Sequence, residues 1–150
     1  LRSLMASTTP TPDAPDWVRR WPDVYSIVTG YIPEKKPEGG KPKCRPLLVT
    51  QVLRKKGDGR IYLRVAYGTS KIKLLERAGS DLIVQNIDDL DACGLMTPTR
   101  FVINPADQFI RPWDADHFAP WGGSGTPRRG KLTDEMQREY AWLMSQYLTG

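Results

Sequence analysis

Two cysteines, one histidine and no long apolar run set the first limits on this chain of 150 residues. Cys44 and Cys93 lie far apart and have no Cys or His companions, so the sequence offers neither a zinc-binding spacing nor a disulfide framework. We expect both to be inert, small hydrophobic side chains in a reducing compartment. No apolar segment approaches the roughly 20 residues that cross a bilayer, and residues 1–16 lack the apolar core of a secretion signal. We therefore expect no membrane partner and a cytoplasmic protein.

The single histidine, His117, lies in an aromatic loop between Trp113 and Trp121. One histidine cannot form a paired-His metal site, and the sequence has no P-loop or nucleophile elbow. Asp114 and Asp116 could join His117 around a divalent ion, but a hydrogen-bonded loop histidine beside acidic residues is the favoured interpretation. We expect no metal and no cofactor, so any catalysis would use Arg, Lys, hydroxyl and carboxylate groups.

The 13 prolines and 13 glycines are concentrated in a few segments. A chain of this size can form one domain that buries roughly 70% of the surface of its unfolded state. We expect a flexible or partner-ordered arm over residues 1–16, a barrel over 17–103, a Trp/Gly/Pro-rich extension over 104–131, and an amphipathic helix over 132–149.

Hydrophobic alternation predicts a β-hairpin from strands 46–53 and 60–67, joined by a polar, glycine-bearing tip. One face of the second strand would carry Ile61, Leu63, Val65 and Tyr67, and the other Tyr62, Arg64 and Ala66. Further strands are expected over 24–28, 81–84 and 100–104, with a turn or short helix over 87–93. These short strands and long loops favour a mainly β fold with one C-terminal helix, arranged as a small, strongly bent barrel.

The end of the chain has helical periodicity. Thr133 can cap a helix whose first turn carries Asp134 and Glu135. Apolar residues then recur with helical spacing at Leu132, Met136, Tyr140, Leu143/Met144 and Tyr147. We also expect Trp142 in the core, whereas Trp113 and Trp121 remain open as either packing anchors or platforms for stacked bases.

Charge is distributed unevenly along the chain. Residues 35–77 contain 13 basic and three acidic residues, which gives +10, whereas residues 81–119 contain seven Asp and two Arg, which gives −5. A basic strip of this kind suits RNA or another phosphate-bearing partner, because each cation near a phosphate releases a counterion. A solvated face balanced by its acidic neighbour, or a self-association surface, explains the same pattern, and the sequence leaves both open.

Arginine and hydroxyl side chains point to chemistry on phosphates. RNA cleavage needs no protein nucleophile, because the ribose 2′-OH attacks the adjacent phosphate and the protein stabilises the charge. Arg45 precedes the first strand of the hairpin and Thr69 follows the second, so the two lie at the same end of the hairpin. Further candidates for binding RNA or phosphate are Lys43, Arg64, Ser70, Lys71 and Lys73.

Several of these segments together resemble the PemK/MazF-like growth-inhibitor toxins. The resemblance runs through Asp23-Val24-Tyr25, Gly39-Gly40, Arg45-Pro46-Leu47-Leu48-Val49-Thr50-Gln51 and Tyr67-Gly68-Thr69-Ser70-Lys71. It implies a small barrel of the Src-homology-3 type with a terminal helix, and a metal-independent endoribonuclease that leaves a cyclic phosphate. It also implies that Arg45 and Thr69 are catalytic and Ser70 an adjacent contact.

This sequence departs from the family pattern at three places. Pro22 stands where the family usually has glycine, Tyr67-Gly68 replaces a more apolar approach to Thr69, and residues 104–131 are an addition. The Tyr-Gly-Thr-Ser variant is similar to sequences found in phage genomes.

Two functions from different classes follow from the sequence. The first is a toxin-like endoribonuclease for single-stranded RNA, with an antitoxin as a further partner. The second is a non-catalytic barrel in a phage particle, such as a head–tail connector, neck or decoration component, which would place the protein in the virion. In both cases we expect a homo-oligomer or larger assembly, formed through residues 1–16 and 104–131.

Overall fold

The centre of the fold is a long antiparallel hairpin. The computed structural model describes residues 13–33, 44–71 and 80–149, and in it β2 (Cys44–Arg54) pairs with β3 (Ile61–Thr69). The tip turns through Gly57 and Gly59, which both have positive φ, a conformation that costs glycine little. This confirms the hairpin that the sequence predicts; β2 is longer than predicted by two residues at its start and one at its end, and β3 starts one residue later and ends two residues later than predicted.

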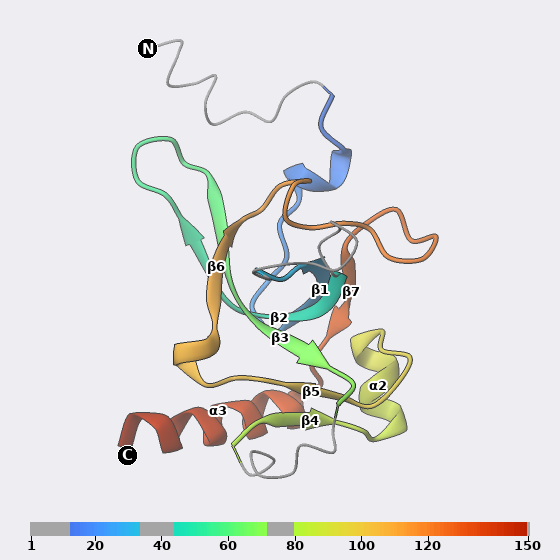
Figure 1. Ribbon diagram of the computed structural model, residues 1–150, viewed down its shortest axis with the longest axis vertical. Coiled ribbons are helices and arrows are strands. Elements are labelled where there is room, and N and C mark those ends of the chain that lie inside the picture. Colours follow the sequence, from blue (N-terminus) through green and yellow to red (C-terminus); the bar gives the residue numbers. More distant parts are fainter. Residues whose placement is uncertain (1–12, 34–43, 72–79, 150) are drawn as a thin grey trace.

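The hairpin lies within a curled antiparallel sheet of seven strands (Figure 1). On one side, β2 pairs with β1 (Ser26–Tyr31), and β1 pairs with β7 (Arg128–Lys131). On the other, β3 pairs first with β6 (Phe109–Pro112) and then with β5 (Thr99–Phe101), which continues to β4 (Leu82–Val84). The sequence-based expectation of a mainly β, small and strongly bent barrel is confirmed.

Two irregularities accompany the curl of the sheet. The ladder between β2 and β3 shifts register between Val49 and Gln51, and the ladder between β1 and β7 shifts between Ile27 and Val28. Such bulges bend a strand and increase its twist. Both β6 and β5 lie along the outer edge of β3, so residues 99–112 form one wall of the curled sheet.

Two α-helices and two 3₁₀ helices complete the described elements. α2 (Ile87–Cys93) is capped by the Asn86 side chain and ends at Gly94 in the left-handed conformation. α3 (Asp134–Thr149) begins after Thr133, whose hydroxyl accepts a hydrogen bond from the Met136 N–H at 3.3 Å, as a capping threonine does. The short helices are η1 (Asp16–Arg19) and η4 (Pro105–Asp107). None of the helices in the described ranges has the length and apolar character to span a membrane.

Opposite faces of the hairpin pack into two separate hydrophobic clusters. The helix cluster joins Leu48, Ala66 and Phe101 to Met136 and Tyr140 of α3, which lies along the base of the sheet (Figure 1). The tryptophan cluster takes the alternate side chains, with Leu47, Val49, Leu63 and Val65 packed against Trp17, Trp113 and Phe118. The faces predicted for the second strand therefore match the packing.

Three expectations from the sequence need correction. Trp142 is 61% exposed rather than in the core, and Cys44, expected to be an inert, small hydrophobic side chain, is exposed, whereas Cys93 is buried. Burial raises the pKa of the Cys93 thiol to about 12, which keeps it protonated and unreactive. Residues 104–131, expected as an extension, supply β6 and β7 and so form part of the sheet itself.

Candidate functional site

A row of polar side chains crosses three neighbouring strands at the end of the hairpin away from its tip. In the ladder between β2 and β3, Leu47 lies opposite Tyr67, so two further residues bring Arg45 beside Thr69. Thr69 is in turn paired with Arg100 of β5. Residues opposite each other in adjacent strands point to the same face. Arg45, Thr69 and Arg100 therefore lie side by side, on the face of the sheet that carries the tryptophan cluster.

These three residues line one open groove of about 520 Å³. Its other lining residues are Ile32, Pro33, Tyr67, Lys71, Asp107 and Phe109. Asp107 and Phe109 come from η4 and β6, so the segment 104–131 forms a wall of the groove and leaves it open. The sequence places Arg45 and Thr69 at the same end of the hairpin, and the structure brings them into the same groove.

The Thr69 hydroxyl accepts one hydrogen bond from the backbone that follows it. Its Oγ1 accepts the backbone N–H of Lys71 at 3.1 Å. A hydroxyl has two acceptor lone pairs and one proton, so this bond leaves the Thr69 O–H proton available to donate to a ligand. The side chain is only 7% exposed, which holds that hydroxyl in a fixed position on the groove wall.

The cations of the groove differ in how firmly they are held. Arg100 is 4% exposed, and its Nη1 donates to the buried Asp81 carboxylate at 2.7 Å, while its Nε has no hydrogen-bond partner among the described residues. Arg45 makes no side-chain hydrogen bond or ion pair within the described ranges. Lys71 is exposed and its ammonium group also has no partner among the described residues, so there the groove has two cations with unused donors and one that is fixed by a carboxylate.

The remaining predicted binding residues fall in several places. Ser70 is exposed next to Thr69 but does not line the groove. Arg64 points to the opposite face of β3, where its Nε donates to Gln108 Oε1 at 3.2 Å and its Nη2 to the Pro105 carbonyl at 3.1 Å. The structure therefore does not bring Arg64 to Thr69. Lys43 and Lys73 lie outside the described residues.

Sequence reasoning missed two charged residues of the groove, Arg100 and Asp107. Arg100 begins the expected strand 100–104, but nothing local indicates that this strand pairs with the end of the hairpin. Asp107 follows Asn104, whose side chain accepts the Ala106 N–H at 3.0 Å and starts the η4 turn. The Asn-Pro pair at 104–105 is the one sequence signal that could have marked this turn.

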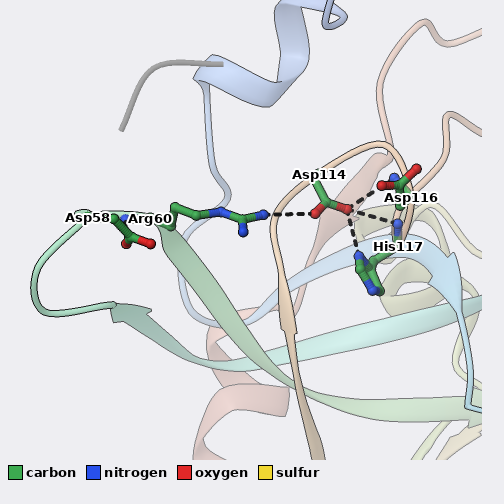
Figure 2. Close-up of polar contacts among 5 residues, drawn as sticks. All are labelled: Asp58, Arg60, Asp114, Asp116 and His117. Atoms are coloured by element: carbon green, nitrogen blue, oxygen red, sulfur yellow. Dashed lines mark hydrogen bonds and ion pairs between the residues drawn. The ribbon is translucent and has the colours of Figure 1, made fainter. Parts of the chain in front are cut away.

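His117 is held by a carboxylate of its own loop, as Figure 2 shows. Asp114 Oδ1 lies 2.7 Å from His117 Nδ1 and accepts the backbone N–H groups of Asp116 and His117, while Oδ2 pairs with Arg60 at 3.1 Å. The Asp114 carboxylate is thus already engaged on both oxygens. His117 is the hydrogen-bonded loop histidine that the sequence favours, and no group of three or more metal-ligating side chains occurs within the described ranges.

The tryptophans left open by the sequence have different environments. Trp113 is 6% exposed and packs edge-on against Trp17, with ring centroids 4.9 Å apart. Trp121 is partly exposed, its Nε1 donates to the Arg128 carbonyl at 3.1 Å, and the Arg129 guanidinium lies 4.5 Å from the ring centroid. Trp113 is therefore a packing anchor, and Trp121 is held by arginines at the surface.

No protein-family model matches this chain, and no curated protein sequence matches it either. We therefore infer function from the side chains that line the groove.

Proposed function

We propose that this protein is a metal-independent endoribonuclease of the PemK/MazF-like type, which cleaves single-stranded RNA in the groove at the end of the hairpin. The observation that carries the proposal is the cross-strand row of Arg45, Thr69 and Arg100 on one open groove. A guanidinium group presents several N–H donors in a fixed geometry that suits the oxygens of a phosphate. Cations and a hydroxyl donor in one groove match the needs of phosphoryl transfer.

The reaction needs one nucleophile, which the RNA itself supplies. The ribose 2′-oxygen forms a bond to the adjacent phosphorus while the bond from phosphorus to the 5′-oxygen breaks, leaving a 2′,3′-cyclic phosphate and a 5′-hydroxyl end. Arg45 and the Thr69 O–H donate to the non-bridging oxygens, where negative charge grows in the transition state. The 2′-hydroxyl proton passes to the Asp107 carboxylate, and the leaving 5′-oxygen takes a proton from water.

The test is incubation of the purified protein with a long unstructured RNA in EDTA. Wild-type protein is expected to cut the RNA and leave cyclic phosphate ends, and an RNA with a single 2′-deoxynucleotide at the cut position should stay intact there. Arg45→Ala is expected to slow cleavage by about a hundredfold to a thousandfold, the effect typical of removing one donor to a developing oxyanion.

Matched variants separate chemistry from folding. Thr69→Val removes the hydroxyl at nearly constant volume and should be inactive, whereas Thr69→Ser keeps the hydroxyl and should retain cleavage. Arg111→Ala removes an arginine of β6 that does not line the groove, and it should leave the rate unchanged. Intact RNA with wild-type protein, together with its copurification in a large particle, would contradict the proposal in favour of the non-catalytic phage barrel.

A further inference from the structure

A second hollow borders the same tryptophan cluster, towards the tip end of the hairpin. Its volume is about 330 Å³, which is within the roughly 300–1,000 Å³ of small-molecule sites. η1 and the turn after it form one wall, and Gly125, Thr126 and Arg128, at the start of β7, form another. We call this hollow the tryptophan cleft, because Trp17, Trp21 and Trp113 all line it.

The tryptophan cleft combines aromatic surface with positive charge. Trp21 is 45% exposed, unlike its two buried neighbours, and the Arg54 guanidinium lies over its ring at 5.7 Å from the centroid. Arg20 and Arg128 also line the cleft, are exposed, and make no side-chain ion pair within the described ranges. The acidic lining residue, Asp16, is paired with Arg19 at 3.4 Å. An exposed indole flanked by unpaired guanidinium groups suits a ligand with both a flat ring and a phosphate.

One wall of the cleft also holds an unsatisfied polar group. Trp17 is 8% exposed, and its Nε1 is buried with no hydrogen-bond partner among the described residues. Trp113, by contrast, donates its own Nε1–H to the Trp17 carbonyl at 3.4 Å. Buried donors without partners are rare in folded proteins because each costs free energy. This donor is enclosed within the wall, so the case for a ligand in the cleft rests on the exposed Trp21 ring and on the arginines beside it.

The tryptophan cleft and the groove lie along the same strand. The Trp113 backbone N–H donates to the Ile61 carbonyl at the start of β3 at 2.9 Å, and Tyr67 and Thr69 line the groove at the end of that strand. Six residues of strand separate Ile61 from Tyr67, which corresponds to roughly 20 Å in an extended strand and less in a bent one. Trp17 and Trp113 of the cleft belong to the tryptophan cluster, and Tyr67 and Phe109 of the groove pack against it, so the two hollows border the same cluster.

We propose that the tryptophan cleft is a nucleotide-binding subsite for single-stranded RNA, in which a base stacks on Trp21 while Arg20 and Arg128 contact the adjoining phosphate. This proposal rests on the proposed function, since it assigns the cleft to the substrate of the groove. Stacking on an aromatic ring tolerates every base, so the subsite adds affinity and positions the strand without dictating its sequence.

The test measures binding of a labelled polyuridine oligonucleotide with 2′-O-methyl groups, which the proposed reaction cannot cleave. Trp21→Ala is expected to weaken binding about tenfold or more, and Trp21→Phe should restore most of the affinity because the phenyl ring also stacks. Arg128→Ala should weaken binding and lower the salt dependence by about one phosphate contact. The matched control is Trp142→Ala, which removes an indole that is 61% exposed on α3, against 45% for Trp21, and should leave affinity unchanged.

The outcomes separate this proposal from the proposed function. Binding that depends on Trp21, with no cleavage of unmodified RNA, would support the subsite and contradict the ribonuclease. Cleavage by wild-type protein with binding indifferent to Trp21→Ala would overturn the subsite and leave the ribonuclease in place. Equal losses in Trp21→Ala and Trp142→Ala, or binding of an acidic peptide in place of RNA at Trp21, would also overturn the subsite.

Discussion

Arg45 and Arg64 belong to the same hairpin but lie on opposite faces of it. On the face covered by α3, the Arg64 guanidinium donates hydrogen bonds to Gln108 and to the Pro105 carbonyl. On the other face, Arg45 lines an open groove and makes no side-chain hydrogen bond or ion pair within the described ranges. The comparison shows that a basic strip in a sequence can contain both arginines that are hydrogen-bonded within the fold and arginines that are available to a ligand. Here the alternation of side chains along the strands determines to which group each arginine belongs.

The helix-side face carries a network of hydrogen bonds centred on Gln108. Gln108 Oε1 receives the Arg64 N–H and lies 2.6 Å from the Thr50 hydroxyl, while its Nε2 donates to the Ile103 carbonyl at 2.8 Å. Burial raises the pKa of nearby Tyr140, and a hydrogen bond with Gln108 opposes that rise. These contacts tie the connection between β5 and β6 to the hairpin, so this face contributes stability.

The largest expected effect on stability comes from the helix cluster. Phe101 is fully buried there, and Phe101→Ala should lower the free energy of unfolding by about 3–5 kcal/mol because it leaves a cavity. Urea denaturation followed by circular dichroism measures this loss. A loss below about 1 kcal/mol would show that the helix-side face is not the stabilising one.

Arg64→Ala is expected to be the next most costly change. It leaves the Pro105 carbonyl and the Gln108 amide oxygen without their charged donor, which typically costs about 1–3 kcal/mol. The same denaturation assay applies, with Arg138→Ala on the exposed surface of α3 as the control. If the two variants have the same free energy of unfolding, the hydrogen bonds of Arg64 do not stabilise the fold and the contrast with Arg45 is wrong.

Alkaline pH should weaken the helix cluster through Cys93. Its pKa is raised from 9.0 to about 12 by burial, so the folded protein keeps the thiol neutral where the unfolded chain ionises it. This stability is fully present below pH 9 and is lost as the pH rises from about 9 towards 12; between pH 8 and pH 10 the loss is on the order of 1 kcal/mol. The raised pKa of Tyr140 acts in the same direction.

The check is the difference between wild-type protein and Cys93→Ala across this range of pH. The variant should be less stable at pH 8 because of its smaller side chain, and the gap should narrow towards pH 10. Parallel pH profiles would contradict a buried, neutral thiol.

Trp142→Ala should have the smallest effect. The side chain is 61% exposed on α3, so its removal is expected to change the free energy of unfolding by no more than about 0.5 kcal/mol. The thermal unfolding midpoints of Trp142→Ala and Phe101→Ala, measured together, compare the loss of an exposed aromatic residue with the loss of a buried one. A large loss would mean that Trp142 has packing contacts beyond those of its helix.

Local sequence patterns predicted the hairpin well because its contacts are short in range. Alternation assigned the faces of β3 correctly, and the turn chemistry placed Arg45 and Thr69 at one end. The strand pairing of Arg100 with Thr69 could not be predicted, since it joins residues 31 positions apart and the connection, which includes β4 and α2, carries no register information. Asp107 joined the groove by the same long-range pairing.

The misplaced Trp142 has a different cause. The apolar stripe of α3 runs through Met136, Tyr140 and Leu143, and two residues after Tyr140 a helix has turned about 200°. Trp142 therefore faces away from the stripe. The prediction that it lies in the core followed from its residue type and not from its position on the helix.

The most direct test of the account is cleavage of unstructured RNA in EDTA by Arg45→Ala and Arg64→Ala, measured side by side with the unfolding midpoint of each. The account predicts that Arg45→Ala keeps the wild-type midpoint and loses about a hundredfold or more in cleavage rate, whereas Arg64→Ala unfolds more easily and, while folded, still cleaves. Equal cleavage by the two variants, or no cleavage by the wild-type protein, would contradict it.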